Sequence, residues 1–144
     1  ESGVDPRPGA LALVMRLAGA GVPRAVASGS PAAVIDEVLV RAGLAPHLPL
    51  RLGSDAVRRG KPAPDLFLLA AQRLEVPPER CVVLEDSANG VAAALAAGMS
   101  CIAVPGPYTA PATVAGATLV LQTLEGIELA TLQRLALAPR PDPA

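Results

Sequence analysis

Short runs of apolar residues alternate with longer segments of helical periodicity along this chain of 144 residues. The clearest run covers residues 81–84, which are all apolar and are followed at once by Glu85, Asp86 and Ser87. Unbroken apolar runs of this length are typical of strands that are buried on both faces of a parallel sheet. Similar runs predict further strands at 24–27, 48–52, 100–104 and 118–121.

The segments between these runs carry apolar residues three and four positions apart, which is the spacing of one helix face. They predict helices over 9–18, 31–42, 64–74, 87–97 and 129–137. The alternation favours an α/β fold with a doubly wound, Rossmann-like parallel sheet and helices on both faces. The length fits one domain, so we expect an α/β core over residues 8–137 and a disordered, proline-rich tail over 138–144.

Charge and composition argue against a nucleic-acid partner. The 12 Lys and Arg residues nearly balance the 13 Asp and Glu residues, whereas a nucleic-acid interface needs clustered positive charge. One Phe, one Tyr and no Trp leave no platform on which bases could stack. The core is therefore expected to be aliphatic.

A long stretch without charge lies between Asp86 and Glu125, but it does not predict a membrane span. A spanning helix needs roughly 18 or more apolar residues in a row, and glycine and proline interrupt this stretch repeatedly. Two cysteines are too few for a disulfide framework, and the start of the sequence shows no signal-peptide pattern. We expect a cytoplasmic protein without a membrane partner.

Polar groups suited to a phosphate or a cation follow three of the predicted strands. Ser28 and Gly29 follow the first strand, Lys61 lies in the loop after the second, and Glu85 and Asp86 end the third. Because the carboxyl ends of parallel strands lie along one edge of a sheet, we expect these groups to meet. Phosphoryl transfer uses such parts, namely donors for phosphate oxygens, a positive charge and carboxylates that hold Mg²⁺.

Each of these features also has a purely structural explanation. Ser28 and Gly29 could form a simple turn, Lys61 could be a solvated lysine, and Glu85, Asp86 and Ser87 could cap a helix. The glycine and prolines around Lys61 restrict its backbone, and capping does not explain a second carboxylate. All three features on one sheet edge favour a shared site.

Three stretches carry a resemblance to a known family: V-A-S-G-S at 26–30, R-R-G-K-P-A-P-D at 58–65 and V-L-E-D-S-A-N-G-V-A-A-A-L-A-A-G-M at 83–99. They resemble motifs of the haloacid dehalogenase superfamily, and the sugar-phosphate phosphatase and beta-phosphoglucomutase-like branch most of all. The likeness runs from residue 8 to about residue 135.

The resemblance implies a role for each candidate residue. Ser28 and the Gly29 amide would bind the transferring phosphate, and Lys61 would neutralise its charge, so Ser28 and Lys61 are the expected catalytic residues. Asp86 would bind Mg²⁺, with Glu85 as a second ligand or a supporting group. Apart from the resemblance, Asp55 falls on the same predicted sheet edge, and we expect it to support the site by orienting Lys61.

The sequence departs from the family at the nucleophile, which is an aspartate in a D-x-D motif that no part of this sequence contains. Asp5 has no apolar strand before it, Asp36 falls within a predicted helix, and Asp142 lies in the tail. The chain resembles the family core without its first strand, acid/base aspartate and cap. In the family that strand lies between those ending at Ser28 and Glu85, so we expect two unpaired strand edges and low stability.

These observations lead to two functional expectations. The first is a Mg²⁺-dependent phosphatase or phosphomutase acting on a small phosphorylated metabolite, with a sugar phosphate favoured, here without its nucleophilic aspartate. The alternative is a non-catalytic phosphate- or Mg²⁺-binding module used in regulation or assembly. A receiver-type signalling domain fits less well, since its acidic pair would come early and its lysine late. The sequence indicates no oligomeric state.

Overall fold

The computed structural model describes residues 7–138, so Asp5, Asp142 and the predicted disorder of the last six residues lie outside the described part. The α-helices and strands, in chain order, are α1 (Ala10–Gly19), β1 (Val26–Ala27), α2 (Ala32–Ala42), β2 (Arg51–Leu52), α3 (Asp65–Leu74), β3 (Val82–Glu85), α4 (Ala88–Ala96), β4 (Ser100–Ala103), β5 (Leu119–Val120) and α5 (Leu129–Leu137). Short 3₁₀ turns link them at η1 (Ala45–His47), η2 (Ser54–Ala56), η3 (Pro78–Arg80) and η4 (Pro111–Val114).

Every strand pair in the described part of the chain is parallel, which confirms the α/β class with a parallel sheet. The strands divide into a β1–β2 pair and a β3–β4–β5 sheet. Val83 is in register with Cys101, and Ala27 with Leu52. Among the described residues no strand pairs with β1 and β3 on their facing sides, so the two expected unpaired edges are present.

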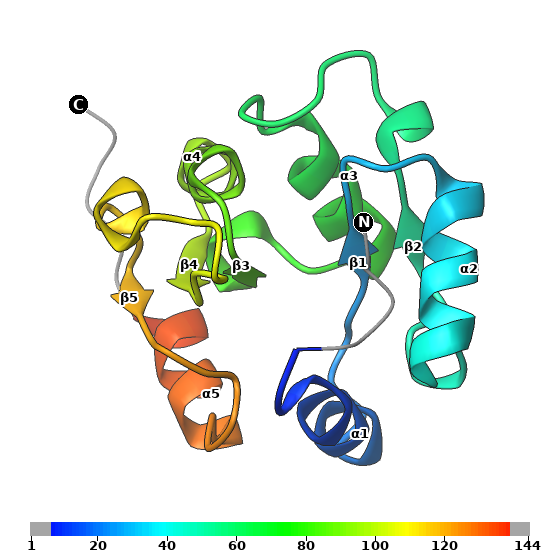
Figure 1. The fold of residues 1–144 in the computed structure, drawn as a ribbon, viewed down its shortest axis with the longest axis horizontal. Helices are drawn as coiled ribbons and strands as arrows, with labels where there is room; N and C mark the ends of the chain where they lie inside the picture. Colours follow the sequence, from blue (N-terminus) through cyan, green and yellow to red (C-terminus); the bar gives the residue numbers. More distant parts are fainter. Residues whose placement is uncertain (1–6, 139–144) are drawn as a thin grey trace.

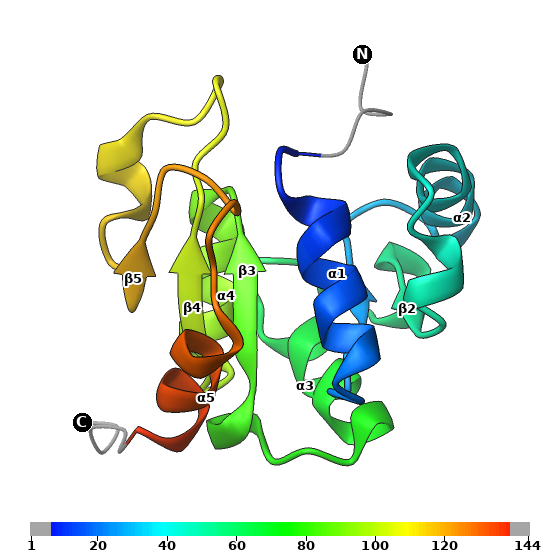
Figure 2. The ribbon, with the colours of Figure 1, turned by 90° about the horizontal axis from the view of Figure 1, so that it is seen from below.

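Helices cover both faces of the strands. Figure 1 shows α3 and α4 on one side of the strand layer and α1 and α5 on the other, while α2 packs beside β2. Seen after a quarter turn, α5 lies across β3 and β4, and α1 lies over the region between β3 and β2 (Figure 2). This layering agrees with the predicted doubly wound arrangement.

The core is aliphatic, as the composition predicted. The last three residues of β4, Cys101, Ile102 and Ala103, are fully buried. In α4, Ala93 and Ala94 are also fully buried, and their small side chains allow the helix to lie close to β3 and β4. The single phenylalanine, Phe67 in α3, joins this cluster.

Helix α1 connects the two groups of strands. Its Arg16 guanidinium donates a hydrogen bond to the carbonyl of Ile127, just before α5, while the helix also contacts η1 in the first half of the chain. Gly9, which precedes α1, has φ +88°, and a Cβ there would lie 2.6 Å from the backbone nitrogen of Glu125. A side chain cannot be accommodated at Gly9, so α1 is held against both halves of the fold.

Residues 7–138 contain no helix of sufficient length and hydropathy to cross a membrane.

The unpaired edges predict low conformational stability. We expect urea to unfold the chain at a midpoint below about 3 M, since a domain of this size with about 10 kcal/mol of stability would unfold near 5 M. Circular dichroism at 222 nm follows the transition. A midpoint near that of the robust domain would contradict this expectation.

Candidate functional site

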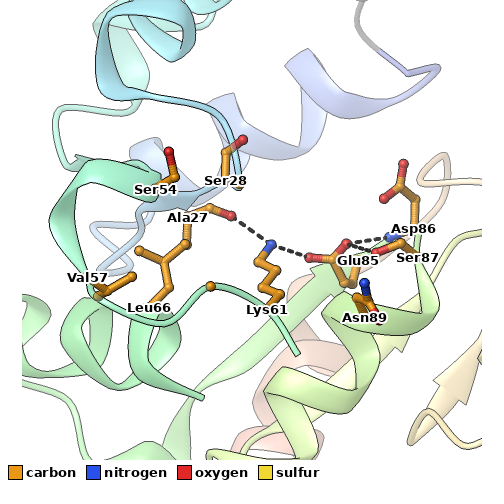
Figure 3. Close-up of a pocket in the computed structure, with 12 residues that line it drawn as sticks. Ala27, Ser28, Ser54, Val57, Lys61, Leu66, Glu85, Asp86, Ser87 and Asn89 are labelled. Carbon is orange, nitrogen blue, oxygen red and sulfur yellow. Dashed lines mark hydrogen bonds and ion pairs between the residues drawn. The ribbon is translucent and has the colours of Figure 1, made fainter. Parts of the chain in front are cut away.

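The ends of β1 and β3 and the loop before α3 converge on one pocket of about 550 Å³. It is lined by Ala27, Ser28, Gly29, Ser54, Val57, Gly60, Lys61, Leu66, Glu85, Asp86, Ser87 and Asn89. Figure 3 shows Ser28 and Asp86 on opposite sides of this pocket, with Lys61 and Glu85 between them. The structure thus brings together the five residues expected to bind phosphate and metal.

Lys61 bridges the two groups of strands. Its Nζ donates to the carbonyl oxygen of Ala27 in β1 at 3.1 Å and to Oε2 of Glu85 in β3 at 2.7 Å. The same ammonium lies 4.7 Å from the centre of the Phe67 ring, a distance at which a cation and an aromatic face attract each other. The side chains of Lys61 and Glu85 are only 14% and 10% exposed, so this ion pair is largely shielded from water.

The loop that carries Lys61 is fixed at its ends. Arg59 donates from Nε and Nη2 to the two carboxylate oxygens of Asp65, at 3.2 and 3.0 Å, and so ties the loop to the start of α3. The amide of Ala63 donates to the carbonyl of Gly60 across the residues around Lys61. These contacts direct the lysine into the pocket, against the alternative of a solvated side chain.

Both carboxylate oxygens of Glu85 accept hydrogen bonds from other groups of the protein. Besides the ion pair with Lys61, its Oε1 accepts from the Asp86 amide at 3.1 Å and from the Ser87 hydroxyl at 3.3 Å. Ser87 in turn caps α4 by accepting from the amide of Gly90 at 3.1 Å. Of the two roles expected for Glu85, this geometry favours that of a supporting group beneath the site over that of a metal ligand.

Asp86 keeps an exposed carboxylate at the rim, with no ion pair within 4 Å among residues 7–138. Partial burial, followed by the hydrogen bond and charge of Glu85, raises the pKa of Asp86, although Arg7 acts to lower it. The residues described do not form a cluster of three or more His, Cys, Asp or Glu side chains that could hold a metal. Mg²⁺ bound near phosphate commonly takes only one or two carboxylates and completes its shell with water and phosphate oxygens, so Asp86 fits that ion.

Ser28 is prepared to donate a hydrogen bond. Its backbone amide donates to the carbonyl of Leu52, and its Oγ accepts from the Ser30 amide at 3.1 Å. The hydroxyl proton therefore remains available to an oxygen in the pocket. Gly29 is exposed beside it, and a Cβ at Gly29 would meet nothing within 4 Å.

The role expected for Asp55 needs correction. Its Oδ1 accepts from the Ala32 amide at 3.2 Å and so satisfies the start of α2, while the hydrogen bonds of Lys61 go to Ala27 and Glu85. Lys61 is therefore oriented by Glu85. Asp36 lies exposed in α2 and pairs with Arg51, as its position within a predicted helix suggested.

Sequence reasoning missed some residues of the pocket. Ser54 and Asn89 line it but are not among the site residues expected from the sequence. Gly90 allows the Glu85 carboxylate its position, because a Cβ at Gly90 would lie 1.8 Å from Cδ of Glu85. The sequence did offer a signal for this close approach, namely a glycine in the first turn of a helix. Glycine lowers helix stability there by about 1 kcal/mol relative to alanine, so its presence indicates another requirement.

Cys101 lies near the ion pair but does not supply a nucleophile. Burial, followed by the charge of Glu85, raises the pKa of this thiol to about 12, with Lys61 acting in the opposite direction. The side chain is fully buried in β4 and is not bonded to Cys81. It therefore stays a neutral thiol in the core.

Comparison with known proteins agrees with this geometry. Residues 1–98 match the family model described as a haloacid dehalogenase-like hydrolase. Hexitol phosphatase A from Escherichia coli (strain K12) is 41% identical over 125 residues, which cover 87% of this chain and 57% of that protein.

Solved structures share the fold. CbbY from Rhodobacter sphaeroides, in complex with xylulose-(1,5)bisphosphate, superposes with a TM-score of 0.84 at 36% identity over 92% of this chain and 61% of that chain. A hydrolase from Deinococcus radiodurans with bound phosphate and sodium gives a TM-score of 0.80 at 35% identity, over 92% and 62% of the two chains. The chain thus spans about three fifths of the length of each of these proteins.

Proposed function

This chain belongs to the haloacid dehalogenase-like hydrolases, and on that premise we propose that its pocket binds the phosphate and the Mg²⁺ of a sugar-phosphate phosphatase or phosphomutase. The observation that carries the proposal is the largely buried Lys61–Glu85 ion pair, set in one pocket with Ser28 and Asp86. A lysine held at the carboxyl ends of two parallel strands presents positive charge where an anion would enter.

In this proposal, several residues each bind a different oxygen of the phosphoryl group. The Ser28 hydroxyl and the Gly29 amide donate to its oxygens, and the third N–H of Lys61, beyond those used by Ala27 and Glu85, donates to another. Glu85 fixes the position of Lys61 through their ion pair. Donors fixed before the substrate arrives need no reorganisation during reaction, which is the main source of catalysis in phosphoryl transfer.

Asp86 is the proposed direct ligand of Mg²⁺. Bound there, the ion would neutralise the phosphate charge that develops during transfer. Glu85 supports Asp86 because its Oε1 accepts a hydrogen bond from the backbone amide of Asp86. The carboxylate of Asp86 must be ionised to bind the cation.

The proposed substrate class is a small sugar phosphate. Two relatives carry this chemistry in their names, a hexitol phosphatase and a protein complexed with xylulose-(1,5)bisphosphate. The pocket is open and polar enough for a hydrated phosphate, and its volume of about 550 Å³ accommodates a five- or six-carbon sugar phosphate.

We expect Asp86→Asn to weaken Mg²⁺ binding at least tenfold, because the amide removes the charge but keeps the shape of the ligand. Isothermal titration of the 144-residue chain with MgCl₂, in the presence of fructose 1-phosphate, measures this effect. Asp36→Asn, on the exposed face of α2, is the matched control and should bind as the parent does. Equal affinities of Asp86→Asn and the parent would remove Asp86 from the site.

A second candidate function is a non-catalytic module that binds phosphate and Mg²⁺ without turnover. One observation favours it: among the described lining residues the acidic side chains are Glu85 and Asp86, both of which already have other roles. Hydrolysis of p-nitrophenyl phosphate by the 144-residue chain separates the two candidates. Mg²⁺-dependent turnover that Asp86→Ala abolishes supports the enzyme, whereas Mg²⁺-dependent phosphate binding without turnover supports the module.

A further inference from the structure

Ser54, the first residue of η2, lines the pocket and is exposed to solvent. Its hydroxyl makes no hydrogen bond within residues 7–138. We infer that Ser54 determines substrate specificity, because its hydroxyl binds the hydroxyl group that a phosphorylated sugar or polyol carries on the carbon next to the phosphate-bearing one. This inference rests on the proposed function and adds to it the recognition of the carbon chain.

The backbone holds Ser54 beside the loop that carries Ser28. The Ser28 amide donates to the Leu52 carbonyl at 3.0 Å, so the parallel pairing of β1 and β2 continues past the end of β1. One step further, the Ser54 amide donates to the Ser30 carbonyl at 2.9 Å. This close approach needs Gly53, where a Cβ would lie 2.5 Å from the Ser30 carbonyl oxygen. The position of Ser54 is therefore set before a ligand arrives, which lowers the entropy lost on binding.

Ser54 lies outside the part of the pocket assigned to the phosphate and Mg²⁺. In Figure 3, Ser54 is on the far side of Ser28 from Asp86, and Lys61 lies between Ser28 and Asp86. A phosphoryl group that contacts these three residues leaves Ser54 to the next part of the ligand, which is the carbon chain. A serine hydroxyl both donates and accepts hydrogen bonds, and so does a sugar hydroxyl, so the two groups can pair in either direction.

The other polar side chains that line the pocket are engaged elsewhere or lie farther from the carbon chain. Lys61 and Glu85 bond each other, and the Ser87 hydroxyl bonds Glu85 and caps α4. Asn89, in the first turn of α4, lies on the opposite side of the pocket from Ser54 (Figure 3). Ser54 is therefore the polar side chain of the lining that remains for a hydroxyl next to the bound phosphate.

The surroundings of Ser54 favour a neutral hydroxyl over a second anionic group. Lys61 is the only cation among the residues that line the pocket, and its ammonium is paired with Glu85. Next to Ser54, the exposed carboxylate of Asp55 accepts a hydrogen bond from the amide of Ala32, the first residue of α2. This carboxylate occupies the donor that an anion would use there, and it repels a second negative charge.

Ligands that differ in one hydroxyl test the role of Ser54. Propyl phosphate and the two enantiomers of 1,2-propanediol 1-phosphate share the same carbon chain, and only the diol phosphates carry a hydroxyl next to the phosphate-bearing carbon. Isothermal titration of the 144-residue chain in excess MgCl₂ measures the affinity for each ligand and for inorganic phosphate. We expect one diol phosphate to bind about fivefold more tightly than propyl phosphate, which is the effect of one neutral hydrogen bond.

Ser54→Ala should abolish this preference. It removes the hydroxyl, so the affinity for the preferred diol phosphate should fall about fivefold while the affinity for propyl phosphate changes by less than about twofold. Ser54→Thr keeps the hydroxyl and should retain most of the preference. Since Ser54 is exposed and is held through its backbone, both variants should fold as the parent does, which circular dichroism checks.

The titration with inorganic phosphate separates failure of this inference from failure of the proposed function. If the parent binds inorganic phosphate but prefers neither diol phosphate, or if Ser54→Ala keeps the preference, Ser54 does not bind the hydroxyl. An equal loss for all ligands in Ser54→Ala would mean that Ser54 contacts the phosphate or shapes the pocket, and would also overturn the inference. If the parent does not bind inorganic phosphate at all, the proposed function fails, and the inference fails with it.

Discussion

We expect Lys61→Met to lower the free energy of unfolding by about 3 kcal/mol, because it leaves the Glu85 carboxylate largely buried without its cation. Methionine keeps most of the side-chain volume and the contact with Phe67, so the loss of stability measures the effect of removing the positive charge of Lys61. The ion pair also links β1 to β3 through the Ala27 carbonyl, so the variant loses a contact that no backbone pairing replaces. Urea unfolding followed by circular dichroism measures the change.

A control variant and a double variant test whether the burial of the unpaired Glu85 carboxylate causes this loss of stability, as opposed to the loss of an ion pair in general. Arg41→Met removes the pair with Glu37, whose side chains are 60% and 63% exposed, and should cost under about 0.5 kcal/mol. Glu85→Gln added to Lys61→Met removes the stranded charge and should restore part of the stability. If the double variant is no more stable than Lys61→Met, an unpaired buried carboxylate is not the cause.

Much of the fold could be predicted because periodicity reports burial directly. The helix expected over 129–137 is α5, and the apolar run at 81–84 lies within one residue of β3. The run at 48–52 gives only the two residues of β2, because the Arg51 guanidinium bonds the carbonyls of Leu48 and Ala45 and holds a turn ahead of the strand. A side chain that bonds backbone several residues away leaves no periodic signal.

The location of the site could also be predicted, but its internal contacts could not. The carboxyl ends of parallel strands lie along one edge of the sheet, so the strand order alone predicts that Ser28, Lys61 and Asp86 lie close together. This prediction does not depend on the direction of their side chains. The partner of Lys61 depends on the direction of individual side chains. Glu85 takes that place, and Asp55, which is nearer in sequence, bonds the start of α2. Glu85 and Asp86 are adjacent in the sequence but have different surroundings. Glu85 lies beneath the pocket, and Asp86 lies at its rim.

Gly90→Ala tests the same ion pair from the opposite side, and here the two relevant effects have opposite signs. Helix propensity alone predicts about 1 kcal/mol of stabilisation. The added Cβ would, however, lie 1.8 Å from Cδ of Glu85, which cannot move without breaking its bonds to Lys61, Asp86 and Ser87. We therefore expect a net loss of about 1–3 kcal/mol in urea unfolding, together with weaker phosphate binding.

Two further measurements decide whether the Glu85 collision is the cause of that loss. Gly19→Ala, at the end of α1 where a Cβ would meet nothing within 4 Å, should be neutral or stabilising. In a Glu85→Ala background the collision partner is absent, so Gly90→Ala should there become neutral or stabilising as well. An equal loss in both backgrounds would mean that Gly90 is required for some contact other than the one with Glu85, and that the position of this carboxylate does not depend on the glycine.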